Sequence, residues 1–243
     1  MSHHYMHVDG LSFSWPGGIR ALDNITLAVK HGESLALIGS NGAGKSTLLL
    51  HLCGSIIPQS GAVDIGGVTV HKNNLKLIRR SVGMVFQNAD DSLFMPSVYE
   101  EAAFGPRNLD LDEEHVAKKA EAALNLTGIM HLKDRPVYRL SAGEKKLASI
   151  AAVLSLEPSI LLLDEPSASL DPKSRRNLIN LLSGFSHTKI IATHDLDLAL
   201  ALCSRAVILN AGKIAADGNI IEIMKNAELL EKNRLEQPLS LRY

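Results

Sequence analysis

The sequence lacks the features of secreted, membrane-spanning and disulfide-stabilised proteins. It has two cysteines, Cys53 and Cys203, which lie far apart and match no metal-binding spacing. We expect both to be core residues with free thiols, as in a reducing compartment. The longest apolar stretches, around residues 150–156 and 160–163, are much shorter than the ~20 residues of a membrane-spanning helix. With no recognisable signal peptide, we expect a soluble cytoplasmic chain that reaches a membrane only through a partner.

An excess of basic charge is also missing. The chain has 25 lysines and arginines against 26 aspartates and glutamates, which gives a formal net charge of -1 and an isoelectric point near 6.8. No block of lysine or arginine is present that would follow a nucleic-acid backbone. The composition therefore argues against nucleic acid as the partner.

The length favours a single α/β domain with an insertion. A single hydrophobic core stops growing near ~250–300 residues, and the chain has 243 residues. We predict one domain over residues 1–243, with a helical lobe inserted at about residues 88–158 and a polar tail at about 228–243. The lobe is indicated by Asp112, a suitable N-cap, which is followed by small and apolar residues at helical spacing.

Short apolar runs that end in polar residues dominate the rest of the chain. Runs at residues 34–38, 82–86, 160–163 and 189–193 predict buried strands of a parallel sheet. Because the carboxyl ends of such strands meet in one crevice, the polar residues that follow them should converge. Near the N-terminus, residues 8–13, 21–29 and 62–70 predict an antiparallel edge sheet, and residues 206–216 predict a hairpin.

A glycine-rich loop follows the first predicted parallel strand and precedes a predicted helix at residues 46–52. In such a loop, successive backbone N–H groups point at phosphate oxygens, and the helix adds its positive N-terminal end. Lys45 would reach the β- and γ-phosphates of ATP, and Ser46 would coordinate Mg²⁺. The alternative is a glycine-rich turn that binds nothing. The predicted nucleotide-binding residues of this loop are Gly39, Ser40, Asn41, Gly42, Ala43, Gly44, Lys45, Ser46 and Thr47.

Two carboxylates end the apolar run at residues 160–163. Asp164 is the carboxylate expected near the metal ion, directly or through water. Glu165 is the candidate base that orients the attacking water. A solvated turn is the alternative, but the phosphate loop earlier in the chain favours catalysis.

Further motifs follow the loop in a recognisable order: Gln87, Leu140-Ser141-Ala142-Gly143-Glu144, Ser169-Leu170-Asp171 and His194. With these motifs, residues 6–218 resemble the nucleotide-binding subunits of ABC transporters. The resemblance implies a P-loop NTPase of the ABC type, with a mainly parallel sheet, helices on both faces, an N-terminal antiparallel edge sheet and an inserted helical lobe.

The resemblance also implies roles for single residues. Gln87 would contact Mg²⁺ and water and sense the membrane partner, and His194 would contact the γ-phosphate. Ser141 and Gly143, in the signature motif, would face the nucleotide of another copy. Trp15 stands where the family places an aromatic residue that stacks on adenine; the alternative is a tryptophan buried against the antiparallel sheet.

The signature departs from the usual Leu-Ser-Gly-Gly-Gln at Ala142 and Glu144. The negative charge of Glu144 near an anionic nucleotide predicts slower turnover. The alternative is that Glu144 points away, to Lys145 or Lys146.

A narrower resemblance covers residues 85–94 and 97–106, which look like the ATPase subunits of energy-coupling-factor importers of the cobalt and nickel type, although Ala89 replaces their usual proline. Leu93, Phe94 and Met95 would then receive a helix of the membrane partner, or else form core of the lobe. Three histidines lie near the start of the chain, at His3, His4 and His7. We expect them to belong to a frayed terminus; the alternative is a metal-sensing site.

Together these features predict an ATPase that drives a membrane importer for cobalt or nickel ions. Its cofactors would be ATP and Mg²⁺, and its place the cytoplasmic side of the cell membrane. Its partners would be a second copy or a related ATPase subunit in a two-fold dimer, and integral membrane subunits. The alternatives are a vitamin importer, a soluble mechanical ATPase acting on DNA or ribosomes, and a small-molecule kinase.

Overall fold

The structure, a computed structural model, describes residues 5–241. The chain clusters into two compact units. We call residues up to 82, 159–165 and from 186 onward the sheet unit, and residues 83–158 and 166–185 the helical unit. The prediction of one domain stays a prediction. Within residues 5–241, no helix combines the length and apolar composition that crossing a bilayer requires.

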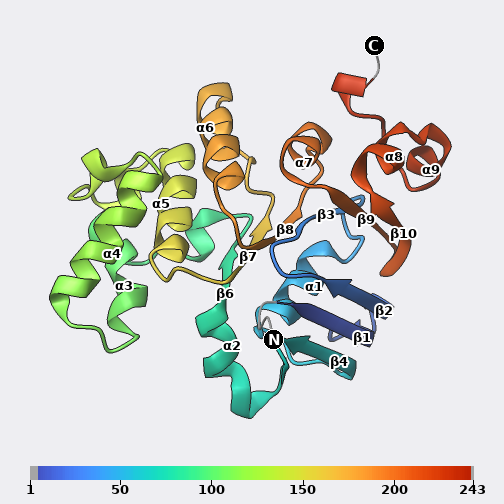
Figure 1. Cartoon of the computed structure of the whole chain (residues 1–243), viewed down its shortest axis with the longest axis horizontal. Helices are drawn as coiled ribbons and strands as arrows, with labels where there is room; N and C mark the ends of the chain where they lie inside the picture. The colour runs from blue at the N-terminus through green and yellow to red at the C-terminus, as the bar shows by residue number, and fades with distance from the viewer. Residues whose placement is uncertain (1–4, 242–243) are drawn as a thin grey trace. The chain divides into compact units, whose positions relative to one another are not determined.

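The predicted N-terminal antiparallel sheet is present in the sheet unit (Figure 1). Its core face is formed by buried apolar residues such as Leu11, Leu22 and Ile25. The single strand predicted at residues 62–70 is wrong, because Gly66 and Gly67 adopt positive φ angles of 59° and 84° and turn the chain there. The strand order is β2 (Arg20–Val29), β1 (Met6–Ser14), β4 (Ser60–Ile65) and β5 (Val68–Thr69).

The second sheet of this unit is mainly parallel. Strand β3 (Ser34–Ile38) pairs in parallel with β8 (Thr188–Ala192) and β9 (Arg205–Asn210), and β8 pairs in parallel with β7 (Ile160–Asp164). Every residue of β7 and β8 is buried, as expected for strands covered on both faces. Helix α1 (Lys45–Leu52) and helix α7 (Leu196–Leu202) contact this sheet, and Figure 1 shows them on opposite sides of it.

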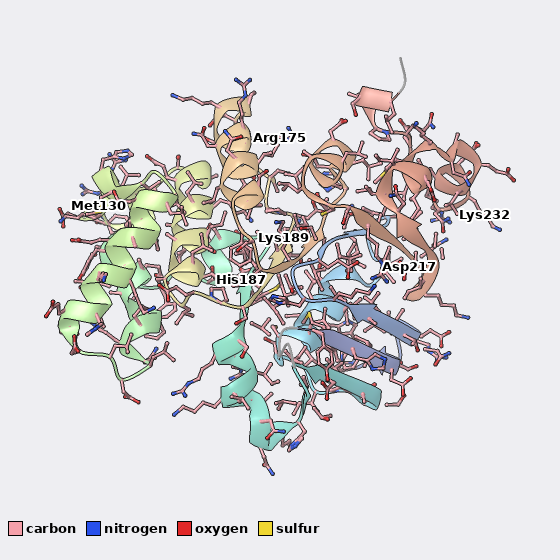
Figure 2. All side chains as sticks on the ribbon, in the orientation of Figure 1. Met130, Arg175, His187, Lys189, Asp217 and Lys232 are labelled. Atoms are coloured by element: carbon pink, nitrogen blue, oxygen red, sulfur yellow. The ribbon has the colours of Figure 1, made fainter. Side chains whose placement is uncertain are left out.

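The predicted hairpin forms the edge of this sheet. Strand β10 (Lys213–Asn219) pairs antiparallel with β9. Arg205 of β9 bonds Asp217 of β10, with Nε and Oδ1 2.6 Å apart; Asp217 is labelled in Figure 2. The remaining helices of the unit are α2 (Leu75–Ser81), α8 (Ile220–Lys225) and α9 (Ala227–Lys232).

The helical unit contains the predicted lobe. Asp112 caps helix α4 (Glu113–Leu126), as predicted, by accepting a hydrogen bond from the His115 N–H. Asp171 likewise caps α6 (Pro172–Ser183). The other helices are α3 (Val98–Arg107) and α5 (Ala142–Leu154), and strand β6 (Val82–Val85) leads into the unit. Short 3-10 helices occur in this unit at η2 (Ala89–Asp91), η3 (Met130–Leu132) and η4 (Val137–Arg139), and in the sheet unit at η1 (Lys72–Asn74) and η5 (Leu239–Leu241).

Both ends of the described chain are built into the sheet unit. His3 and His4 lie outside the described residues, whereas His7 lies in β1, opposite Ala28 and Asp64. The frayed terminus predicted for His7 is therefore wrong. In the tail, Asn233 is buried and accepts a hydrogen bond of 2.9 Å from Asn210 Nδ2.

Candidate active site

The glycine-rich loop connects β3 to α1 in the predicted strand–loop–helix arrangement. Two glycines allow close packing: a Cβ atom on Gly39 would lie 2.3 Å from the Leu209 carbonyl oxygen, and one on Gly44 would lie 2.5 Å from that of Ala21. Gly44 also has a φ of 106°, which favours glycine. The loop geometry therefore requires glycine at these two positions.

Lys45 begins helix α1 and lies buried against its own loop. Its Nζ donates hydrogen bonds to the carbonyl oxygens of Gly39, at 2.7 Å, and Ser40, at 3.2 Å. Burial lowers the pKa of Lys45 below its ordinary value, and the carboxylates of Glu165 and Asp164 oppose this shift. A buried cation close to two carboxylates and a glycine loop is suited to binding phosphate.

The register of the parallel strands gathers three of the predicted polar ends. Ala192 of β8 lies opposite both Leu37 of β3 and Asp164 of β7. The carboxyl ends of these three strands therefore lie side by side in the sheet. They are followed by the phosphate loop, the Asp164–Glu165 pair and His194. Within the sheet unit, the predicted convergence is confirmed.

Glu165 is held in a strained and well-anchored position. It is 5% exposed and has a φ of 44°, and its N–H donates to Ala192 O at 2.8 Å. Its Oε2 accepts a hydrogen bond of 3.0 Å from Thr193 Oγ1 and lies 2.9 Å from His194 Nδ1. The His194 N–H donates to Oε1 at 3.1 Å. Strained backbone that is fixed in this way is typical of functional sites.

Sequence reasoning missed Thr193, which is fully buried and orients Glu165. The available signal was its place between an apolar strand and His194.

The oxygen ligands offered by Ser46 and Asp164 fit Mg²⁺, because a hydroxyl and a carboxylate are hard ligands. Ser46 is exposed in the first turn of α1, whereas Asp164 is buried.

Trp15 follows β1 and is 40% exposed. Its ring contacts Phe13 edge to face, with centroids 5.0 Å apart. The backbone N–H of Trp15 donates to the Ile19 carbonyl oxygen at 2.9 Å and so closes the turn before β2. The alternative of a tryptophan buried against the sheet is therefore wrong, and an accessible ring remains for a base.

Ser141, Gly143 and Gln87 lie in the helical unit. Ser141 is the N-cap of α5, and its hydroxyl oxygen accepts from the Glu144 N–H at 3.3 Å. The Glu144 carboxylate accepts in return from the Ser141 N–H at 2.7 Å, which completes a capping box. Arg135 binds the other carboxylate oxygen at 3.1 Å. These hydrogen bonds, with Arg135, lower the pKa of Glu144.

The predicted pairing of Glu144 with Lys145 or Lys146 is wrong. Lys145 instead binds Asp90 at 2.6 Å. Lys146 is 3% exposed, and its Nζ donates to the carbonyl oxygens of Phe86, at 2.9 Å, and Gln87, at 2.6 Å. Sequence reasoning missed that Lys146 holds the backbone of the glutamine loop, where the Gln87 side chain is exposed.

The segment predicted to contact a membrane partner, residues 93–95, is held by one buried carboxylate. Glu101 Oε2 accepts hydrogen bonds of 2.9 Å from the N–H groups of both Phe94 and Met95. Phe94 is 66% exposed and contacts the ring of Phe104. The alternative that Phe94 belongs to the core of the lobe is therefore wrong.

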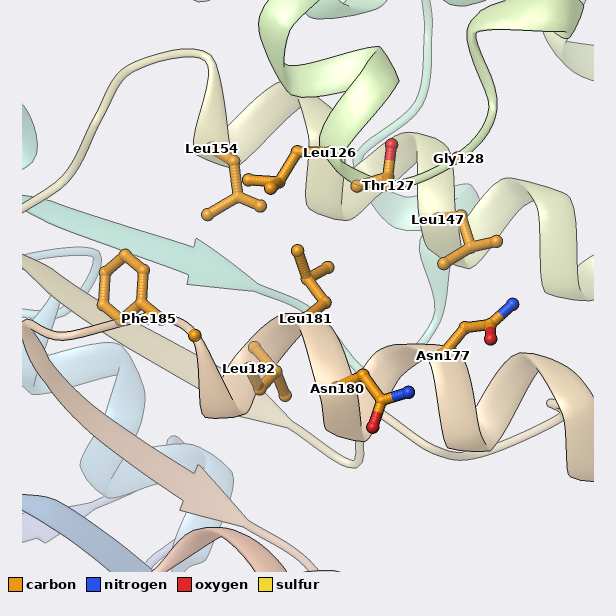
Figure 3. Close-up of a pocket in the computed structure, with 11 residues that line it drawn as sticks. Leu126, Thr127, Gly128, Leu147, Leu154, Asn177, Asn180, Leu181, Leu182 and Phe185 are labelled. Atoms are coloured by element: carbon orange, nitrogen blue, oxygen red, sulfur yellow. The ribbon is translucent and has the colours of Figure 1, made fainter.

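The helical unit also contains a hollow of about 420 Å³ that involves none of the predicted nucleotide-binding residues. Figure 3 shows Leu126, Leu147, Leu154 and Leu181, with Phe185, around it. It is mainly apolar and therefore does not suit a nucleoside triphosphate.

Comparison with known proteins agrees with these motifs. The ABC transporter family pattern matches residues 22–168. A protein of Geobacter sulfurreducens, whose name assigns it provisionally as an ABC transporter ATP-binding protein, is 51% identical over 241 residues, which cover 99% of this chain and 97% of the relative.

Two further relatives have more specific names. The energy-coupling factor transporter ATP-binding protein EcfA of Carboxydothermus hydrogenoformans is 42% identical, over 96% of this chain and 87% of the relative. The cobalt import ATP-binding protein CbiO of Rhodobacter capsulatus is 43% identical, over 95% of this chain and 84% of the relative.

Solved structures of related proteins confirm the predicted fold class. CbiO1 of Clostridium perfringens, described as part of the ABC transporter complex CbiONQ, matches with a TM-score of 0.81 and 37% identity, over 93% of each chain. An ATP-binding cassette solved as a dimer with ADP and phosphate matches with a TM-score of 0.82 and 25% identity, over 88% of this chain and 98% of that one. The chain therefore belongs to the ABC transporter family, and its relatives include ATP-binding proteins named for energy-coupling factor transport and cobalt import.

Proposed function

We propose that this chain hydrolyses ATP to ADP and phosphate and thereby energises a membrane importer for cobalt or nickel ions. The observation that carries the proposal is the arrangement in the sheet unit, where the phosphate loop and the anchored Glu165 follow strands that end at one edge. The names of the relatives supply the cobalt assignment. Uptake assays distinguish cobalt from nickel and from a vitamin as the transported substrate.

The residues of the sheet unit have distinct tasks in this reaction. The loop N–H groups and Lys45 would bind the triphosphate, and Ser46 and Asp164 would hold Mg²⁺. The contact of Gln87, in the helical unit, with Mg²⁺ stays a prediction. When bound, the ion neutralises charge on the phosphates. Glu165 would orient the attacking water and accept its proton as the water oxygen bonds to the γ-phosphorus. The bond between the γ-phosphorus and the β–γ bridging oxygen breaks in the same step, which releases ADP and phosphate.

The anchoring of Glu165 supports this role. Thr193 and the backbone N–H of His194 each donate to its carboxylate, which keeps the acceptor fixed without reorganisation during the reaction. The His194 side chain is largely exposed beside Glu165 and would contact the γ-phosphate. Trp15 would stack on adenine.

The signature implies a second ATPase chain. Ser141 and Gly143, at the exposed start of helix α5, would close over the nucleotide of a second copy or a related subunit. A related cassette solved as a dimer with ADP and phosphate supports this assembly. Because Glu144 is engaged within its own chain, its charge is partly compensated by Arg135 and is compatible with turnover.

Phe94 is the predicted contact with integral membrane subunits, which would place the chain on the cytoplasmic side of the cell membrane. The description of CbiO1 as part of a transporter complex supports such a partner. Nucleic acid is not proposed as a partner, because the chain has no basic excess.

The test is affinity isolation of the chain from native membranes, identification of its partners by mass spectrometry, and uptake assays with cobalt, nickel and vitamins. Phe94→Glu should reduce co-isolation and uptake while the isolated chain still binds ATP, because an unpaired charge is costly in an apolar contact. Tyr138→Glu is the matched control, since Tyr138 is another exposed aromatic residue of the helical unit. Isolation without any membrane protein would overturn the importer assignment.

A further inference from the structure

Three aromatic rings in the sheet unit form a continuous series from the proposed adenine platform to the phosphate-binding helix. Trp15 contacts Phe13 at a centroid distance of 5.0 Å and an interplanar angle of 90°. Phe13 in turn contacts His51 at 4.8 Å and 72°. His51 lies in the last turn of α1, the helix that begins with Lys45. The series therefore joins strand β1 to helix α1.

His51 closes the series on the phosphate side with a hydrogen bond. Its Nδ1 lies 2.7 Å from the carbonyl oxygen of Thr47, in the first turn of α1. Because a carbonyl oxygen can only accept, the proton must be on Nδ1. Thr47 follows Lys45 and Ser46 directly, so this bond reaches the turn that carries the predicted phosphate and metal ligands.

Packing alone does not account for a histidine at this position. His51 is 0% exposed, and its Nε2 makes no hydrogen bond within the part of the chain that the structure describes. A buried acceptor without a partner is destabilising, and an aliphatic side chain would avoid this cost. Burial lowers the pKa of His51, which favours the neutral ring. What histidine adds over leucine is the aromatic contact and the bond to Thr47.

We propose that Phe13 and His51 are positioning residues that join the adenine platform of Trp15 to the phosphate-binding turn of α1, so that base and triphosphate are bound in one fixed relation. The inference rests on the proposed ATP site. Neither residue touches the nucleotide, and both act through neighbours: Phe13 through Trp15, and His51 through Phe13 and Thr47.

The chain supplies its own probe for the platform, because Trp15 is its single tryptophan. Its emission and anisotropy report on the platform without any label. Magnesium tripolyphosphate serves as a ligand without a base. The ratio of its dissociation constant to that of magnesium ATP measures what the base contributes to binding.

Phe13→Leu removes the middle ring and should shift the Trp15 emission. It should weaken ATP binding by about 2- to 12-fold, the range for a lost aromatic pair, with little change for tripolyphosphate. Trp15→Ala should weaken ATP binding in the same selective way, and adding Phe13→Leu to it should have no further effect. Calorimetry measures the variants that lack the tryptophan.

Two substitutions at His51 separate its two contacts. His51→Phe keeps an aromatic ring and should retain the Trp15 emission, whereas His51→Leu should shift it. Both remove the donor to Thr47 and should lower the ratio of the two dissociation constants. The turnover number at saturating ATP should stay near that of the parent in both. His187→Asn, at an exposed histidine of the same unit, is the control for substituting histidine.

The outcomes distinguish this inference from the proposed function. If Lys45→Ala leaves ATP binding intact, the ATP site itself is wrong. If Trp15→Ala weakens ATP binding but Phe13→Leu changes neither emission nor affinity, the ring series is refuted. Equal losses for ATP and tripolyphosphate would show that the rings only support the loop, which overturns the coupling. Should a His51 variant fail to fold, Phe13→Leu still decides the result.

Discussion

The two units hold their candidate functional residues by different means. In the sheet unit, Asp164, Glu165 and His194 are placed by the register of buried parallel strands. In the helical unit, the segments predicted to face a partner are held by single polar side chains that bind backbone groups. Lys146 does this for Phe86 and Gln87 of the glutamine loop. Catalytic placement therefore rests on many apolar contacts, whereas the predicted partner-facing segments each depend on one residue. We expect substitutions in the first unit to change chemistry, and substitutions in the second to change stability and coupling.

The largest effect is expected at Glu165, where strand register places the catalytic group. Glu165→Gln should keep ATP binding and slow hydrolysis by roughly 10²–10⁴-fold, because a positioned base contributes about this much. Phosphate release and calorimetric ATP titration measure the two quantities. Glu157→Gln is the control, since Glu157 is exposed in the helical unit. Hydrolysis at the parent rate would remove Glu165 from its role.

A smaller loss of rate is expected when only the anchoring of Glu165 is weakened. Thr193→Val is similar in size but removes the hydroxyl that donates to the carboxylate. Since a hydrogen bond to a charged group contributes about 1.5–3 kcal/mol, we expect a fall in kcat with an unchanged KM for ATP. Thr193→Ser should restore most of the rate. An unchanged kcat in Thr193→Val would show that strand register alone orients Glu165.

In the helical unit, neighbouring lysines test the dependence on one side chain. Lys146→Met leaves two carbonyl oxygens without their donor and should lower the free energy of unfolding by about 1–3 kcal/mol. Lys145→Met removes only a surface ion pair with Asp90 and should cost less than about 1 kcal/mol. Denaturant unfolding measures both. Equal effects would contradict the contrast between the two units.

The smallest effect is expected at the capping box. Glu144→Ala should destabilise the chain by about 0.5–2 kcal/mol, as loss of a helix cap does, and Glu144→Gln should retain the box. The pKa of Glu144 is lowered in the folded chain. Its contribution is therefore present above the ordinary pKa of a glutamate and is lost as the pH falls through the lowered value. Comparing unfolding of the parent and Glu144→Gln from neutral to acidic pH isolates this term.

Sequence reasoning was reliable where a residue's position depends on its near neighbours. The phosphate loop between β3 and α1, and the cap at Asp112, follow from local spacing. The Ser141–Glu144 box was equally local, yet the charge of Glu144 suggested a lysine partner that the structure replaces with Ser141 and Arg135. Here the backbone N–H of Ser141 donates to the Glu144 carboxylate, because a helix start leaves such groups without partners in the helix.

The sequence by itself determined the family, the phosphate loop, the buried strands and the order of the motifs, because each depends on residue types at short spacing. Only the tertiary structure decided which distant residues meet. Thr193 reaches Glu165 across 28 positions, and Lys146 reaches Gln87 across 59. His51 meets Phe13 through the packing of α1 on the antiparallel sheet. Such pairs carry no periodic signal, because long-range contacts arise from the folding of several apolar surfaces together.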